Sequence, residues 1–99
     1  MNNRFLPNYA VAPGELLLEE LEDRGMTQAQ LAERTGLTKK TINEMVKGKA
    51  PITADTALKF ERILGQSAQY WLNLETLYQE DKARIAELER LKPDTPWLS

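Results

Sequence analysis

The chain has 99 residues, enough for one small domain, and its hydrophobic share of 41% can supply a modest core. Cysteine and histidine are both absent, which excludes disulfide frameworks, thiolate or imidazole zinc sites and histidine-based catalytic triads. The net charge of −2 argues against nucleic acid when the chain is taken whole, and the absence of a signal peptide or long apolar run predicts a cytoplasmic protein that does not enter membranes.

The first predicted helix spans residues 13–24 and follows an N-terminal arm. Residues 1–12 contain Pro7 and show no helical or strand period, so we predict that they form the arm. Pro13 suits the first position of a helix. The acidic residues that follow it would interact favourably with the positive end of the helix dipole. Gly25 is expected to end the helix. Its predicted apolar stripe consists of Leu17, Leu18 and Leu21.

Two short helices joined by a glycine turn come next. Thr27 is expected to cap the first and to form a capping box with Gln30, and Gly36 is expected to end it. Thr38 is expected to cap the second and Gly48 to end it. By the i, i+3, i+4 rule, the inward face of this second helix is Ile42, Met45 and Val46.

A fourth helix is predicted between Thr53, its cap, and Gly65. A fifth helix begins after Ser67 and is expected to continue through the charged stretch until Pro93 stops it. This charged part of the helix either projects into solvent or packs on a second subunit. The apolar residues of these two helices are Ala57, Leu58, Phe60, Ile63, Leu64, Trp71, Leu72, Leu74, Leu77, Tyr78, Ala83, Ile85, Leu88 and Leu91. No segment alternates like a strand, so the fold class is all-α, and the tail 93–99 is expected to be irregular.

Charge is distributed unevenly along the chain. Residues 27–50 carry five cations and two anions, a local charge of +3, whereas residues 13–24 carry five acids and one arginine, a local charge of −4. Salt screens charges over about 8–10 Å, so a local patch matters more to a partner than the total charge does. The basic segment therefore keeps nucleic acid binding open.

The helix after Thr38 has the pattern of a DNA-recognition helix. On a wheel of about 100° per residue, Lys40, Asn43, Glu44 and Lys47 point outward, with Lys39 on the flank nearer the core. The first turn of such a helix meets base edges in the major groove. There, lysine can donate to guanine O6 and N7, and asparagine can pair with adenine N6 and N7.

Residues flanking this helix are assigned to phosphate. Lys47 and Lys49 lie where the helix would leave the groove, and Gln28 starts the preceding helix, where side chain and backbone amide can reach a phosphate together. The predicted DNA-binding residues are Gln28, Thr38, Lys39, Lys40, Thr41, Asn43, Lys47 and Lys49.

Several of these features also have alternative interpretations, some of which involve no binding site. The lysines also fit a solvated helix face, although the glycine turn, the caps and the inward triad favour DNA. Glu44 would repel phosphate, or it would accept a hydrogen bond from cytosine N4 or select against wrong bases. The acids of 13–24 fit a solvated face, or a surface for a basic partner protein. Trp71 fits a core or dimer interface better than a binding site, and Trp97 is either without fixed structure or docked on a partner or subunit.

These segments resemble the HigA-type antitoxins, a branch of the Xre or lambda-repressor-like helix-turn-helix family. The stretch GMTQAQLAERTGLTKKTINEMVKGK at 25–49 carries the superfamily signature. Features of the branch are APGELLLEEL at 12–21, ITADTALKF at 52–60 and YWLNLE at 70–75, and the resemblance covers 13–78. It implies a DNA-binding domain of five core helices over 13–78. From the residues themselves we expect 79–99 to form a helical extension and tail, and we expect no cofactor.

The resemblance also implies partners. It points to a homodimer that binds an inverted-repeat operator in its own promoter, and to a HigB-like ribonuclease toxin of the RelE type that the antitoxin neutralises. Longer relatives continue into a zinc metallopeptidase domain, whose HExxH motif this chain lacks, so we expect either a short standalone regulator or the front half of a longer protein. We expect no enzyme, because the chain has no histidine or cysteine and no glycine loop that could cradle a phosphate. The alternatives are a standalone Xre-family repressor without a toxin, and a protein-binding module that does not regulate DNA.

Overall fold

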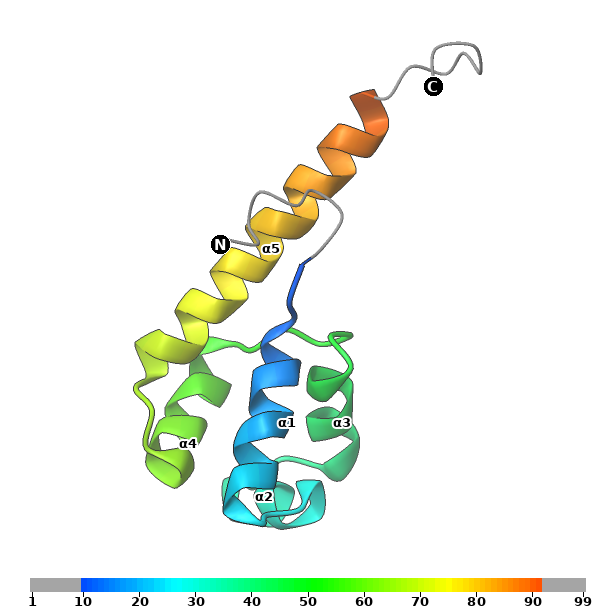
Figure 1. The fold of residues 1–99 in the computed structure, drawn as a ribbon. Coiled ribbons are helices and arrows are strands. Elements are labelled where there is room, and N and C mark those ends of the chain that lie inside the picture. The colour runs from blue at the N-terminus through cyan, green and yellow to red at the C-terminus, as the bar shows by residue number, and fades with distance from the viewer. Residues whose placement is uncertain (1–9, 92–99) are drawn as a thin grey trace.

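The computed structural model describes residues 10–91, which form five helices and no strand (Figure 1). The expected all-α, five-helix class is therefore confirmed. The predicted tail 93–99, including Trp97, and all but Ala10–Ala12 of the predicted arm lie outside the described residues. The helices are α1 (Pro13–Arg24), α2 (Gln28–Thr35), α3 (Lys39–Val46), α4 (Ala54–Leu64) and α5 (Ala68–Leu91).

Threonine and serine caps begin four of the helices where the sequence predicts them. At α2, Thr27 Oγ1 accepts from the backbone N–H of Gln30 at 3.0 Å, and Gln30 Oε1 accepts from the Thr27 N–H at 2.8 Å, so the capping box is confirmed. Thr38, Thr53 and Ser67 accept in the same way from the third residue after each. These bonds satisfy N–H groups that a helix leaves free at its start.

The core lies where α1, α2, α3, α4 and the first turns of α5 meet. Phe60 and Trp71 pack edge to face with ring centroids 5.4 Å apart, and Trp71 is only 1% exposed. The interpretation of Trp71 as a core residue is thus confirmed. The largest fully buried side chains are Trp71, Phe60, Leu17, Leu21, Leu31 and Ile42.

Several residues of the predicted apolar stripes are less buried than the helical pattern suggests. Leu18 is only half-buried, because Leu17 and Leu21 occupy the centre of the α1 face. Leu58 on α4 is 55% exposed and Leu77 on α5 is 40% exposed. Both lie on sides of their helices that no other described element covers fully.

The fifth helix extends well beyond the other four (Figure 1). At 1.5 Å per residue, its 24 residues span about 36 Å. Leu88 and Leu91 near its end are 44% and 67% exposed, so the thin apolar stripe expected there is uncovered in a single chain. Within the described residues, no helix combines the length and apolar character needed to cross a membrane.

Candidate nucleic-acid interface

The turn between α2 and α3 is built from a glycine and an internal hydroxyl. Gly36 has φ 80°, a left-handed conformation that glycine adopts without steric cost. The buried Thr35 hydroxyl donates to the Leu31 carbonyl at 2.8 Å and accepts from the Leu37 N–H at 3.3 Å. The two helices are therefore held in one relative orientation by local chemistry.

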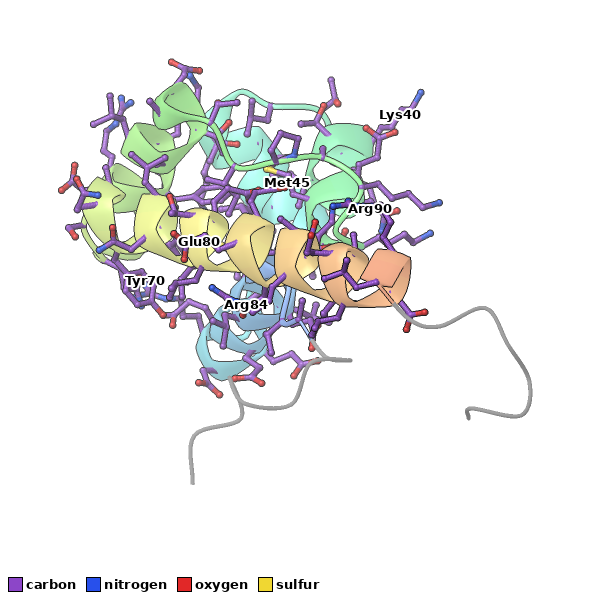
Figure 2. The ribbon with its side chains drawn as sticks, turned by 90° about the horizontal axis from the view of Figure 1, so that it is seen from above. Lys40, Met45, Tyr70, Glu80, Arg84 and Arg90 are labelled. Atoms are coloured by element: carbon purple, nitrogen blue, oxygen red, sulfur yellow. The ribbon has the colours of Figure 1, made fainter. Side chains whose placement is uncertain are left out.

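Helix α3 has a buried face and an exposed face, as predicted. Ile42 and Met45 are 0% and 2% exposed, and Val46 is half-buried against the core. On the other side, Lys39, Lys40 and Lys47 are exposed, and Lys40 points away from the molecule in Figure 2. Lys39 is exposed despite its expected position on the flank nearer the core.

The threonines of the first α3 turn are partly committed to capping. Thr38 Oγ1 accepts from the Thr41 N–H at 3.0 Å and donates its own proton to Thr41 Oγ1 at 2.9 Å. The Thr41 hydroxyl then keeps its proton for an outside acceptor. Thr38 thus orients the helix start, while Thr41 can contact a phosphate or base edge.

Gln28 and Asn43 are brought together across the motif. The Asn43 amide Nδ2 donates to Gln28 Oε1 at 3.3 Å, and both side chains are half-buried. The sequence predicts that each faces DNA but not that they touch, because their contact depends on how α2 and α3 cross.

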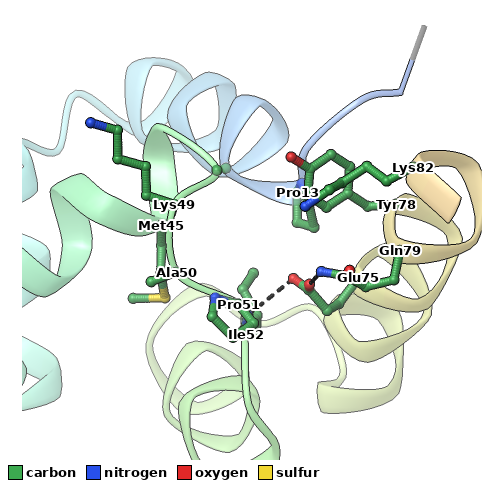
Figure 3. A pocket seen from close by; sticks show the side chains of 12 residues that line it. Pro13, Met45, Lys49, Ala50, Pro51, Ile52, Glu75, Tyr78, Gln79 and Lys82 are labelled. Carbon is green, nitrogen blue, oxygen red and sulfur yellow. Dashed lines mark hydrogen bonds between the residues drawn. The ribbon is translucent and has the colours of Figure 1, made fainter. Parts of the chain in front are cut away.

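The loop after α3, residues 47–52, is held by backbone bonds and by α5. The N–H groups of Lys49 and Ala50 both donate to the Glu44 carbonyl, at 2.8 and 3.2 Å. The Ile52 N–H donates to Glu75 Oε1 at 3.0 Å, as the dashed line in Figure 3 marks. Lys47 and Lys49 therefore extend from a fixed loop. Sequence reasoning missed Glu75, since a glutamate within a charged helix gives no signal of this role.

A small pocket of about 170 Å³ lies between this loop, the start of α1 and α5 (Figure 3). Lys82 Nζ lies over the Tyr78 ring, 4.8 Å from its centroid. Gln79 Nε2 donates to Glu75 Oε2 at 2.6 Å. Four of the polar side chains that line the pocket therefore contact one another in pairs. The pocket therefore lies where α5 meets the loop that carries Lys49.

The acidic side chains of α1 lie on its solvent side. Glu15, Glu19, Glu22 and Asp23 are exposed, whereas Glu20 pairs with Arg24 at 2.6 Å. The cations of α3 and the acids of α1 therefore occupy different helices. Among the described residues, no group of three or more acidic side chains is arranged to hold a metal ion.

Comparisons with known proteins converge on one class. The family model described as "Helix-turn-helix" matches residues 17–71. Virulence-associated protein I of Dichelobacter nodosus is 40% identical over 91 residues, covering 86% of this chain and 84% of that protein. Antitoxin HigA-1 of Vibrio cholerae is 36% identical over 66 residues, covering 66% of this chain and 62% of that protein.

The similarity to one solved structure extends over most of the chain. The Pseudomonas aeruginosa antitoxin HigA, solved with the higBA promoter, has a TM-score of 0.77 to this structure at 29% identity. The match covers 92% of this chain and 100% of that one. It therefore includes α5 as well as the helix-turn-helix.

Proposed function

The chain belongs to the helix-turn-helix family as a HigA-type member of its Xre branch, and from this premise we propose that it is a sequence-specific DNA-binding repressor and antitoxin that controls its own operon. One observation carries the DNA-binding part. Helix α3 buries Ile42 and Met45 and leaves Lys39, Lys40 and Lys47 in solvent, the arrangement that a helix needs to enter the major groove.

In this proposal, α3 reads bases and its surroundings bind phosphate. Lys39, Lys40 and Asn43 contact base edges, with Thr41 donating to a base or phosphate. Lys47 and Lys49, at the end of α3 and on the fixed loop, neutralise phosphates, and Gln28 binds one at the start of α2. Thr38 acts by capping α3.

A homodimer would present two such helices to an inverted repeat. Successive major grooves on one side of a duplex are about 34 Å apart, and the uncovered apolar stripe near the end of α5 supports pairing there. Each half-site would then be bound by one copy of α3. The protein would work in the cytoplasm, where its operator lies, and would need no cofactor and catalyse no reaction.

The antitoxin part rests on the likeness to HigA proteins and on the charge of α1. We propose that the partner is a HigB-like ribonuclease of the RelE type, a basic protein that the exposed acids of α1 would complement. The rival is a standalone Xre-family repressor without a toxin. The exposed face of α3 favours this rival, because DNA binding by that face would not require a toxin.

Replacing Lys40 or Asn43 by alanine is expected to weaken binding to the chain's own promoter by about 1–3 kcal/mol for each base contact that the substitution removes, and to relax base preference there. Lys59→Ala on α4 is the matched control, because it removes the same charge from a lysine paired with Asp55. Gel-shift titrations at several salt concentrations measure both effects. Unchanged binding by both α3 variants would contradict the base-reading role.

Co-expression with the product of the neighbouring reading frame is expected to yield a complex that co-purifies and relieves the toxicity of that product. Reversing the charge of Glu19 and Glu22 should weaken the complex while leaving promoter binding intact, because these acids lie on α1 and not on α3. Failure to co-purify, with normal promoter binding, would instead support the standalone repressor.

A further inference from the structure

We infer that Glu75 on α5 is a positioning residue for DNA binding, since its carboxylate fixes the loop 47–52 from which Lys49 would reach a phosphate. The inference rests on the proposed DNA-binding function and deepens it by giving α5 a part in the interface. It begins from the hydrogen bond between the Ile52 N–H and Glu75 Oε1, which is 3.0 Å long and joins residues 23 positions apart.

The loop is anchored to a different helix at each end. At its start, the N–H groups of residues 48–50 donate to backbone carbonyls of α3. Pro51 comes next and has no N–H to donate. The Ile52 N–H then donates to α5 through Glu75. Glu75 therefore helps to set where the second half of the loop lies relative to α3.

Helix α5 also meets the start of the loop. Gly48 has φ 75°, and a Cβ atom added to it would lie 3.2 Å from the Tyr78 hydroxyl oxygen. Glu75 and Tyr78 lie three residues apart on α5, so they share one face of the helix, and both line the pocket against the loop (Figure 3). A shift of this face of α5 would therefore displace the loop.

The Glu75 carboxylate acts here as a hydrogen-bond acceptor and not as an ion-pair partner. Its Oε1 accepts from Ile52, and its Oε2 accepts from Gln79 Nε2 at 2.6 Å. None of the ion pairs within residues 10–91 includes Glu75. An anion close to a phosphate-binding loop repels DNA, so Glu75 can favour DNA binding only through the bonds that it accepts.

A fixed loop favours phosphate binding by Lys49. This lysine is exposed, and in Figure 3 its side chain points away from the pocket. A lysine on a fixed backbone loses less conformational freedom on binding than one on a backbone that must first be ordered. If Glu75 served stability alone, its loss would reduce the fraction of folded protein and leave the number of phosphate contacts unchanged. Counting phosphate contacts therefore separates the two roles.

The test uses five variants of the full chain: Glu75→Met, Glu75→Gln, Lys49→Ala, the double variant Glu75→Met with Lys49→Ala, and Glu80→Met. Methionine has about the length of glutamate without its oxygens, whereas glutamine keeps an acceptor and loses the charge. Glu80 is the matched control, because it is an exposed glutamate of α5 that does not line the pocket. The measurement is the slope of log Kd for the promoter against log salt concentration, with thermal midpoints recorded at each salt concentration.

Each phosphate contact contributes about 0.9 to the magnitude of this slope. Lys49→Ala is expected to lower the magnitude by about 0.9 for each half-site. Glu75→Met should lower it in the same way, and the double variant should lower it no further than Lys49→Ala does. Glu75→Gln and Glu80→Met should both keep the wild-type slope. Promoter binding by Glu75→Met should also weaken, although this variant has lost a negative charge.

A wild-type slope in Glu75→Met or in Lys49→Ala would overturn the inference. A lowered slope in Glu75→Gln or Glu80→Met would overturn it too, because the charge and not the hydrogen bond would then account for the loss. So would a double variant whose loss equals the sum of the two single losses. Lys49→Ala and Glu75→Gln test the inference independently of any loss of stability in Glu75→Met.

These outcomes are distinct from a failure of the proposed function. In each of them the wild-type protein still binds its promoter, so the proposed repressor function survives. If the wild-type protein itself showed no salt-dependent binding to its promoter, the proposed function would fail first.

Discussion

Replacement of Trp71 by alanine is expected to lower the free energy of unfolding by about 3–5 kcal/mol. The indole is 1% exposed and packs edge to face on Phe60, at 5.4 Å and 71°, and on Tyr70, at 5.1 Å and 80°. Removing it leaves a cavity where α4 and α5 meet. Since domains of this size are stable by only about 5–15 kcal/mol, the variant should lose much of its stability.

Trp71→Phe is the matched control for this prediction. The Trp71 Nε1 group is buried and has no hydrogen-bond partner among the described residues, so phenylalanine removes an unsatisfied donor as well as part of a ring. The removal of the unsatisfied donor and the loss of ring contacts partly offset each other. We therefore expect Trp71→Phe to lower the free energy of unfolding by less than about 1.5 kcal/mol. Urea unfolding followed by circular dichroism compares the two. Equal losses would mean that the ring volume of Trp71 does not support the core.

Features set by neighbouring residues were predictable from the sequence. The capping box of Thr27 and Gln30, and the caps at Thr38, Thr53 and Ser67, depend on contacts three residues apart, and the structure has all of them. The outward and inward faces of α3 follow from its period in the same way. These signals agree with one another, which is why the fold class could be inferred.

Features set by how helices cross were not predictable. The bond between Gln28 and Asn43, and that between Glu75 and the Ile52 N–H, join residues 15 and 23 positions apart. Leu58 fits the apolar pattern of α4 and is nevertheless 55% exposed, because the pattern cannot say how much of a helix its neighbours cover. The identity of the candidate DNA-binding residues therefore came from sequence, and their mutual arrangement from the fold.

Gly14 is a residue whose importance only the fold reveals. It lies in the first turn of α1, where the sequence alone suggests that alanine would favour the helix slightly. A Cβ atom at this position would lie 2.5 Å from Val46 Cα, 2.6 Å from the Val46 oxygen and closer still to the Met45 oxygen. All three are backbone atoms of α3, so no side chain can move aside to make room.

Gly14→Ala is therefore expected to destabilise the fold by roughly 3 kcal/mol, the upper end of the usual cost of overpacking. The clash would also push the end of α3 away from α1. If α3 binds DNA as proposed, promoter affinity should then fall even where the protein remains folded. Urea unfolding and gel-shift titration measure the two losses separately.

Gly25→Ala separates the clash from the general effect of changing a glycine. Gly25 has φ 66°, a strained conformation for alanine, but nothing lies within 4 Å of an added Cβ. Its replacement should cost about 1 kcal/mol and leave promoter binding unchanged, since α3 is not displaced. If Gly14→Ala proved no more costly than Gly25→Ala, the close approach of α1 to α3 would not be what holds α3 in place.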